Sequence, residues 1–290
     1  MKVFVSPFNN PFINLALEDF FLRGGADLPV LLFYVNRPCV VLGRFQNPWL
    51  ECNLKYLVEK DIWMVRRQSG GGCVFHDEGN LNYSFIYPEG MIDRKKGVEF
   101  MQKAFKRADI DLEISPRHDL WLQGRKISGS AFKQIRDASF HHGTFLVSSD
   151  MDKLEESLKH TIIPKESKSI ASVRSKVIKL QEVYPEIEIQ DVIDLIAHEL
   201  KAKPVLLDEQ LLSTPEIHKS FQELTSWEWL WGETPLFELE GGVKVHKGMV
   251  KEPIQGRFGK DLMKDLFSKE ELEKNFPDFS HQYSESQIVF

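Results

Sequence analysis

The stretch of this chain best suited to chemistry is a glycine-rich loop that follows two arginines. It runs Arg66-Arg67-Gln68-Ser69-Gly70-Gly71-Gly72-Cys73-Val74-Phe75-His76-Asp77. Glycine loses more conformational freedom on folding than any other residue, so three in succession indicate a backbone that lies close to another group or adopts positive φ. Successive N–H groups in such a loop form an anion-binding concavity, and an arginine fork adds charge-assisted hydrogen bonds. The loop therefore predicts a phosphate site; a tight surface turn with two solvated arginines is the alternative.

Further motifs stand before and after this loop. They are Phe12-Ile13-Asn14-Leu15-Ala16-Leu17-Glu18, Gly43-Arg44-Phe45-Gln46-Asn47-Pro48-Trp49, Glu51-Cys52-Asn53, Gly79-Asn80-Leu81-Asn82-Tyr83-Ser84-Phe85-Ile86, Gly124-Arg125-Lys126-Ile127-Ser128-Gly129-Ser130-Ala131, His141-His142-Gly143-Thr144, Ser172-Val173-Arg174-Ser175 and Ser226-Trp227-Glu228-Trp229 with Gly232. Together with the loop, these motifs resemble the lipoate–protein ligase A family and its lipoyltransferase relatives. The family signature reads Arg-Arg-x-Ser-Gly-Gly-Gly-x-Val-(Phe/Tyr)-His-Asp-x-Gly-Asn, and the chain meets every specified position.

This resemblance implies an enzyme that attaches lipoate to protein in two steps. The lipoate carboxylate attacks the α-phosphorus of ATP and releases pyrophosphate, and the resulting lipoyl-AMP acylates a lysine amine of a carrier domain. Such an enzyme mainly positions the reactants and stabilises charge on the phosphate. The implied cofactors are ATP and Mg²⁺. The implied partners are apo-lipoyl domains of 2-oxoacid dehydrogenase E2 subunits and the glycine-cleavage H protein, with neither nucleic acid nor membrane among them.

Lys126 matches the lysine that contacts both the phosphate and the acyl carbonyl of the adenylate in this family. A compact ammonium suits that role because it can bridge two oxygens. Without the motif, Lys126 would be interpreted as an exposed lysine at a hairpin turn. Asp119 faces Lys126 across the expected hairpin, where it would orient the ammonium or hold Mg²⁺. A plain cross-strand ion pair is the alternative for Asp119.

The other expected site residues divide between the two substrates. The nucleotide ligands are expected to be Arg67, Gly70, Gly71, Gly72, Cys73, Val74 and Phe75, together with Lys126. The lipoate pocket is expected to include His76, Tyr34, Leu42 and His142, again with Lys126. Arg66 is either a second phosphate ligand or a structural ion-pair residue. Asp77 is expected to serve a turn or cap, and His142 is equally well explained as a hydrogen-bonded core residue.

Composition limits the class of protein. The formal charge of −6 argues against a general polyanion binder. Cys39, Cys52 and Cys73 are odd in number and widely spaced, which favours a reducing compartment over a disulfide framework or a structural zinc site. No apolar stretch approaches the ~18 residues of a membrane span. We expect a cytoplasmic protein, or a mitochondrial-matrix protein whose presequence has been removed.

Strand and helix patterns alternate along the part of the chain that carries these motifs. Strands are expected at 3–5, 31–35, 39–43, 62–66, 73–76, 80–87 and 140–148, and helices at 13–21, 50–60 and 96–108. A hairpin is expected within 117–134, with its turn at Gln123-Gly124 and residues 126–131 returning, before a mainly helical region at 151–232. This pattern predicts an α/β (α+β type) fold, a mixed sheet flanked by helices, and the resemblance implies similarity to biotin protein ligase catalytic domains.

The pattern changes after Gly232. Residues 1–232 are expected to form the catalytic domain, and residues 233–290 a short accessory segment, reduced relative to bacterial-type ligases. A hairpin near 237–248 and a short helix near 268–276 are expected there, the helix begun by Ser268 and Glu271 as a capping box.

Three other functions stay open at this point. A lipoyltransferase would use preformed lipoyl-AMP with little or no activation activity, and it shares the glycine loop and Lys126 with the ligases. An octanoyl-transferase is disfavoured because Ala131-Phe132-Lys133 offers no cysteine nucleophile. An inactive lipoate-binding protein would not need to retain Arg67, the glycines, Lys126 and Asp119 together.

Overall fold

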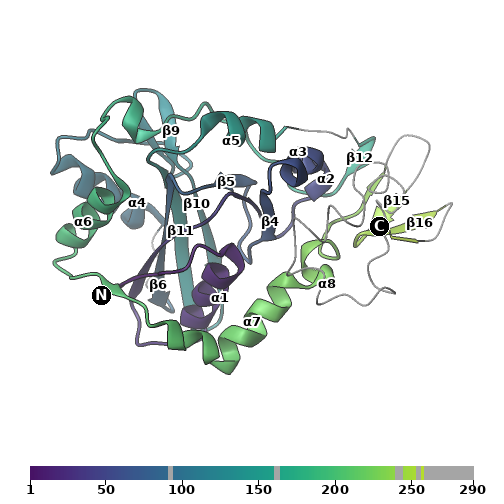
Figure 1. The fold of residues 1–290 in the computed structure, drawn as a ribbon, viewed down its shortest axis with the longest axis horizontal. Coiled ribbons are helices and arrows are strands. Elements are labelled where there is room, and N and C mark those ends of the chain that lie inside the picture. Colours follow the sequence, from purple (N-terminus) through teal and green to yellow (C-terminus); the bar gives the residue numbers. More distant parts are fainter. Residues whose placement is uncertain (91–93, 160–163, 239–243, 253–255, 258–290) are drawn as a thin grey trace. The chain divides into compact units, whose positions relative to one another are not determined.

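The computed structural model describes residues 1–90, 94–159, 164–238, 244–252 and 256–257 (Figure 1). The chain forms two compact units, each assembled from three stretches of sequence. The first unit comprises Met1–Arg37, His76–Asp150 and Val173–Phe221, and the second comprises Pro38–Phe75, Met151–Ser172 and the described part of Gln222–Phe290. The expected boundary at Gly232 stays a prediction. No helix in the described ranges is long and apolar enough to cross a membrane.

The first unit is built on a six-stranded sheet of order β10-β11-β6-β2-β1-β13. Its strands are β1 (Lys2–Val5), β2 (Val30–Val35), β6 (Asn80–Pro88), β10 (Ser130–Gln134), β11 (Ala138–Leu146) and β13 (Val205–Leu206). β1 runs parallel to β2 and β13, whereas β6 is antiparallel to β2 and β11. The sheet is therefore mixed, which confirms the predicted fold class. The continuous apolar run of β2 is buried, as expected for a central strand.

The two faces of this sheet differ in polarity because side chains alternate along each strand. On β6, Leu81, Tyr83 and Phe85 belong to the main apolar core, which α4 (Arg94–Lys106) and α6 (Ile189–Glu199) also help to form. Asn80 and Ser84 alternate with those residues and are buried as well. The strand thus provides an apolar face for folding and a polar face that can carry chemistry.

Helix α1 (Pro11–Leu22) contacts β2, β6 and β11. Asn10 caps it by accepting N–H groups at its start, and proline at its first position needs no N–H partner. The chain then turns at Gly24, whose φ of +100° favours glycine. Glu18 and Asn14 of α1 are buried, so this helix contributes polar groups as well as apolar ones.

The predicted hairpin is present, but its returning strand is broken. β8 (Leu120–Leu122) pairs with β9 (Arg125–Ser128) and with β7 (Glu113–Ile114) in a separate three-stranded sheet. The chain leaves that sheet at Gly129 and enters the six-stranded sheet as β10. The expectation of one strand over 126–131 is therefore wrong, because the apolar pattern does not reveal that a glycine changes the pairing partner.

The second unit contains a three-stranded sheet of order β4-β3-β5, formed by β3 (Cys39–Leu42), β4 (Trp63–Arg66) and β5 (Val74–His76). The helix expected at 50–60 is two helices, α2 (Pro48–Glu51) and α3 (Leu54–Glu59). Cys52 between them is extended, and the Asn53 side chain caps α3 by accepting the N–H of Tyr56. An asparagine at this position offers the backbone a new helix start instead of a continuous helix.

Both units contain further elements from 151 onwards. They are α5 (Met151–Ser157), β12 (Glu166–Ser167), the 3-10 turns Leu180–Glu182 and Glu209–Ser213, α7 (Pro215–Thr225), α8 (Trp227–Leu230), β14 (Phe237–Glu238), β15 (Lys244–His246), β16 (Met249–Glu252) and β17 (Gly256–Arg257). The last four strands and β12 form one antiparallel sheet, so the predicted β14–β15 pairing is confirmed. Phe237 and Val245 pack in the apolar core of the second unit. The helix predicted near 268–276 lies outside the described residues.

Candidate functional site

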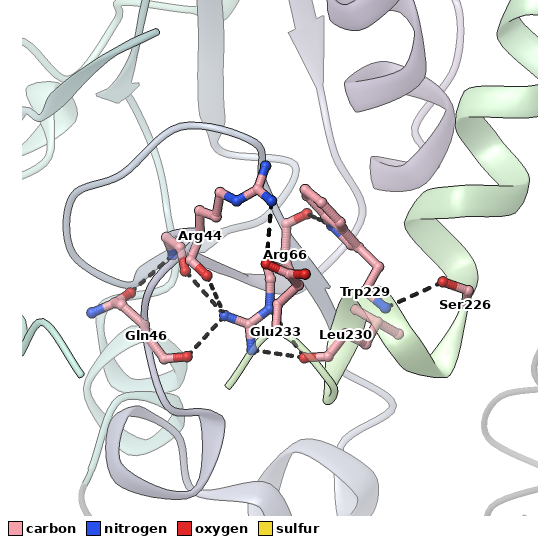
Figure 2. Close-up of polar contacts among 8 residues, drawn as sticks. Arg44, Gln46, Arg66, Ser226, Trp229, Leu230 and Glu233 are labelled. Atoms are coloured by element: carbon pink, nitrogen blue, oxygen red, sulfur yellow. Dashed lines mark hydrogen bonds and ion pairs between the residues drawn. The ribbon is translucent and has the colours of Figure 1, made fainter. Parts of the chain in front are cut away.

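Arg66 is a structural residue at the centre of a buried hydrogen-bond cluster (Figure 2). Its guanidinium donates to the carbonyls of Arg44 and Gln46 at 2.9 and 2.8 Å and to that of Leu230 at 2.7 Å. The side chain is fully buried, and burial lowers the pKa of Arg66 to about 10. Among the described residues, the acceptors of Arg66 are all neutral oxygens, so its guanidinium forms no ion pair there. This decides the role of Arg66 in favour of structure.

The same cluster fixes the side chain of Arg44. Its guanidinium lies 3.2 Å from a Glu233 oxygen and 4.7 Å from the ring centroid of Trp229. The indole N–H of Trp229 in turn donates to the Arg66 carbonyl at 2.7 Å. Ser226 caps α8 through the N–H of Trp229, so the Ser-Trp-Glu-Trp motif is explained by these contacts.

Arg67 organises the glycine loop from within. Its guanidinium donates to the carbonyls of Gly70 and Gly72 at 2.8 and 2.7 Å, and also to Ser69 Oγ and the carbonyl of Val41. In a peptide unit the C=O and the following N–H point in opposite directions. Carbonyls turned toward Arg67 therefore direct the N–H groups of Gly71 and Cys73 away from it.

The loop exposes backbone donors. Among the described residues, no acceptor is found for the N–H groups of Gly70, Gly71 and Gly72, and Gly71 has a φ of +91°. Gly43 lies so close that a Cβ there would overlap the Gly71 carbonyl. This geometry is typical of an anion-binding turn, in which successive amides converge on one negatively charged atom.

Residues after the loop enter the core of the second unit. Cys73 and Phe75 belong to its apolar cluster, and so does Leu42 on the neighbouring strand β3. The thiols of Cys73 and Cys52 are reduced, with their sulfurs 3.9 Å apart. Burial raises the pKa of Cys52 well above its usual value, so that thiol is a poor nucleophile.

In the first unit, the predicted pairing of Lys126 with Asp119 is observed. The Lys126 Nζ lies 3.0 Å from Asp119 Oδ1, and both side chains are largely shielded from solvent. The β9 backbone is held on its other side, where the Lys126 N–H donates to Lys176 and its carbonyl accepts from Ile178. A Cβ on Gly129 would lie 3.1 Å from the ammonium, so glycine there leaves room for it.

Tyr34 and His142, both predicted lipoate residues, meet at a buried carboxylate that sequence reasoning did not assign. Glu18 accepts the Tyr34 hydroxyl at 3.1 Å, and one of its oxygens lies 3.0 Å from His142 Nδ1. Since the carboxylate is the acceptor, Nδ1 of His142 donates this hydrogen bond. The sequence feature that indicates a role for Glu18 is its place among the apolar positions of the helix, between Leu17 and Phe21.

His76 lies at the end of a second polar chain in the same unit. The Asn14 amide donates to the carbonyls of Phe8 and of the Asn36 side chain, so the Asn36 amide nitrogen faces His76 Nδ1 at 3.1 Å. This sequence of bonds assigns the ring proton of His76 to Nε2. Asp77 caps the next segment by accepting the N–H groups of Gly79 and Asp150, as predicted.

The predicted site residues thus form two sets. Lys126, Asp119, His76, Tyr34 and His142 lie in the first unit, and Arg67, Gly70, Gly71, Gly72, Cys73, Val74, Phe75 and Leu42 lie in the second. Within the described ranges, no group of three or more histidine, cysteine, aspartate or glutamate side chains is arranged to hold a metal. A lone carboxylate such as Asp119 suits the Mg²⁺ that accompanies ATP, because that ion keeps waters and phosphate oxygens as its other ligands.

Comparison with known proteins agrees with these observations. The model of the lipoyl protein ligase A/B catalytic domain matches residues 10–201. The chain is 37% identical to lipoate-protein ligase A of Psychrobacter cryohalolentis, over 82% of this chain and 74% of that protein. It is 36% identical to a putative lipoate-protein ligase A of Schizosaccharomyces pombe, over 82% of this chain and 72% of the relative.

A crystal structure gives the same result for the fold. That of P. falciparum LipL1 in complex with lipoate superimposes with a TM-score of 0.73 at 26% identity, covering 95% of this chain and 94% of that one. The Arg-Arg-x-Ser-Gly-Gly-Gly loop lies within the matched residues 10–201, and so does the hydrogen bond from Arg67 to the Gly72 carbonyl. This chain belongs to the lipoyl protein ligase A/B catalytic domain family.

Proposed function

We propose that this protein is an ATP-dependent lipoate–protein ligase, which makes lipoyl-AMP and transfers the lipoyl group to a lysine of a lipoyl carrier domain. The observation that supports this most strongly is the glycine loop, whose Gly70–Gly72 amides have no acceptor among the described residues while Arg67 holds the loop carbonyls inward. A loop prepared in this way suits a phosphate group. It is the element that an adenylating enzyme needs and a simple lipoate-binding protein does not.

In this proposal Arg67 acts mainly by shaping the loop. Its guanidinium donates to Ser69, Gly70 and Gly72 of the loop and to Val41 of β3, so the phosphate oxygens would be bound by the amides of Gly70, Gly71 and Gly72. Cys73, Val74 and Phe75 would then lie along the nucleotide by virtue of their place after the loop. The positive guanidinium still contributes electrostatically, because it stands directly behind these amides.

Lys126 would supply the cation that acts on the phosphate during the reaction. As the carboxylate attacks phosphorus, negative charge develops on the phosphate oxygens, and an ammonium beside them lowers the barrier. Asp119 would orient the ammonium, from the observed distance of 3.0 Å. The same carboxylate is the candidate ligand for Mg²⁺ brought with ATP, which would neutralise the leaving pyrophosphate.

The lipoate chain would lie against the polar face of the six-stranded sheet. Tyr34 and His142 present their rings there, both fixed by Glu18, and His76 is fixed by Asn36. The expected contact of Leu42 with lipoate stays a prediction, and its side chain is fully buried in the core of the second unit. Rings held by buried hydrogen bonds make a pre-organised pocket, which lowers the entropic cost of binding.

Relatives indicate the substrates to test. One structural neighbour from Thermoplasma acidophilum is described with its E2 lipoyl domain, and another neighbour is described as bound with ATP. We propose E2 lipoyl domains as acceptors, with glycine-cleavage H protein as a second acceptor. The reduced thiols are compatible with the cytoplasm or the mitochondrial matrix.

The direct test is mass spectrometry of an apo-lipoyl domain incubated with this protein, lipoate, ATP and Mg²⁺. Addition of one lipoyl group is expected only when all components are present. ATP–pyrophosphate exchange in the presence of lipoate identifies the activation step. If exchange is absent while transfer from synthetic lipoyl-AMP proceeds, the protein is a lipoyltransferase and the ligase proposal is wrong.

A further inference from the structure

Gln46 is fully buried, and its side-chain amide joins two segments of the second unit, residues 43–46 and 170–172. Its Oε1 accepts the N–H of Gly43 at 2.9 Å, and its Nε2 lies 3.3 Å from the Ile170 carbonyl and 2.9 Å from Ser172 Oγ. The backbone N–H of Gly43 can only donate and the carbonyl of Ile170 can only accept, so the orientation of the amide is determined. Gln46 therefore donates a hydrogen bond to the Ser172 hydroxyl oxygen.

Ser172 receives a second hydrogen bond from the glycine loop. The backbone N–H of Cys73 donates to the same Oγ at 2.8 Å. A hydroxyl oxygen has two acceptor sites and one hydrogen to donate, so both acceptor sites of Ser172 are filled and its own hydrogen remains for another group. Among the described residues, no acceptor for this hydrogen is found. Two incoming bonds also polarise the hydroxyl and strengthen it as a donor.

The position of Ser172 is fixed beside the glycine loop. A Cβ added to Gly72 would lie only 3.2 Å from Ser172 Oγ, so the hydroxyl stands directly against the loop backbone. The Ser172 N–H donates to Glu51 Oε1 at 3.2 Å, and the Ile170 N–H donates to the Phe45 carbonyl at 3.2 Å. Backbone and side-chain contacts together hold this hydroxyl beside Gly72, in the loop whose Gly70–Gly72 amides have no acceptor among the described residues.

We infer that Gln46 is a positioning residue that, through Ser172, adds a hydroxyl donor to the anion site of the glycine loop. The inference rests on the proposed function, in which the anion is a phosphate group of ATP. Ser172 contacts the phosphate, and Gln46 sets the direction of its hydrogen. The site thus combines three backbone N–H groups with one O–H group, all fixed before the nucleotide arrives.

Ser172→Ala, Ser172→Thr and Gln46→Glu test this arrangement. S172A removes the donor, and Q46E replaces the donating nitrogen with an accepting oxygen, which draws the Ser172 hydrogen to itself. Both changes are expected to raise KM for ATP about three- to tenfold, the effect of one hydrogen bond, with KM for lipoate unchanged. S172T keeps a hydroxyl and should restore the wild-type KM. Ser169→Ala is the matched control, since that serine bonds only to Ser167 near the surface.

The double variant distinguishes positioning from a separate structural effect. If Gln46 acts through Ser172, Q46E/S172A has the same KM for ATP as S172A alone, whereas multiplied effects overturn the inference. A carboxylate at position 46 can itself impair folding, so S172A and S172T decide the question if Q46E does not fold. Wild-type protein without ATP–pyrophosphate exchange refutes the proposed function and the inference with it. Normal exchange together with an unchanged KM for ATP in S172A refutes the inference alone.

Discussion

The Lys126 ammonium lies 3.0 Å from the Asp119 carboxylate, and the β8–β9 hairpin supports both. The loop before β8 is itself fixed, because the Asp119 carbonyl accepts the Ser115 N–H and the Asp119 N–H donates to Ser115 Oγ. A shielded ion pair of this kind restricts the position of the lysine side chain. The cation proposed to act on the adenylate is thus oriented before any substrate binds.

Lys126→Ala is expected to reduce the rate of ATP–pyrophosphate exchange roughly 10²–10³-fold. Loss of one group that stabilises transition-state charge typically has an effect of this size. Asp119→Asn keeps the size of the side chain and should cost less, because the ammonium remains. The thermal midpoint of Lys126→Ala should stay close to that of the wild type. Full exchange activity in Lys126→Ala would remove this lysine from the catalytic role.

Glu18→Gln is expected to raise KM for lipoate about tenfold, because it removes the charged acceptor that fixes both Tyr34 and His142. Tyr34→Phe loses one hydroxyl and should have a smaller effect on the same constant. KM for ATP should change in neither variant. An equal rise of both KM values would indicate general distortion of the first unit and contradict a lipoate-specific pocket.

Gly43→Ala and Gly70→Ala form a matched pair for the loop. A Cβ at Gly43 would overlap the Gly71 carbonyl, whereas nothing lies within 4 Å of a Cβ at Gly70. Gly43→Ala is therefore expected to lower the thermal midpoint and to raise KM for ATP roughly tenfold or more by displacing the loop. Gly70→Ala should leave the thermal midpoint unchanged. Similar melting curves for the two variants would show that the close approach at Gly43 is unimportant.

Arg66→Leu should be strongly destabilising, by about 3 kcal/mol or more, because several buried carbonyls lose their donor at once. Arg66→Lys restores the charge but not the planar fork, so most of the loss should remain. Urea unfolding of both variants measures the effect. An Arg66→Lys protein as stable as the wild type would show that charge alone matters at this site.

The α4–α6 contact gives a prediction about pH. Lys103 and Arg107 of α4 both pair with Glu199 at the end of α6, and the hydrogen bond from Lys103 is the main reason that the pKa of Glu199 lies below its usual range. A depressed carboxyl pKa means that the unfolded chain binds the proton more readily, so this contribution is present at neutral pH and is lost as pH falls through the folded pKa. Glu199→Gln should therefore lower the thermal midpoint at pH 7, with a smaller difference near pH 3. A constant difference between the two pH values would contradict this account.

Much of the fold was predictable because its elements have strong local signals. The helix at α1 has an asparagine cap, proline at its first position and glycine after its end, and β2 is a continuous apolar run. The two errors concern residues whose effect is decided by tertiary pairing. The chain changes sheets at Gly129, and Asn53 is the cap that starts a second helix, but neither residue type alone indicates this role.

The sequence motifs supply candidate residues for the site but not the contacts among them. The motif identified Arg67, and only the structure shows that its guanidinium turns into the loop. Glu18, Gln46 and Ser172 stand in the quoted motifs, yet the bonds of Glu18 to Tyr34 and His142 and of Gln46 to Ser172 span 16 to 126 residues of the sequence. Hydrogen bonds over such separations depend on how the chain folds, and no local pattern of residue types encodes them.

The Arg66 cluster has a consequence for how this polypeptide tolerates shortening. Its guanidinium takes acceptors from residues 43–46 and, far along the chain, from Leu230 and Thr234. A truncation before Leu230 would leave a buried positive charge without two of its five acceptor oxygens. The first stretch of the second unit, Pro38–Phe75, can therefore complete its folding only after residues as far as Thr234 have been synthesised.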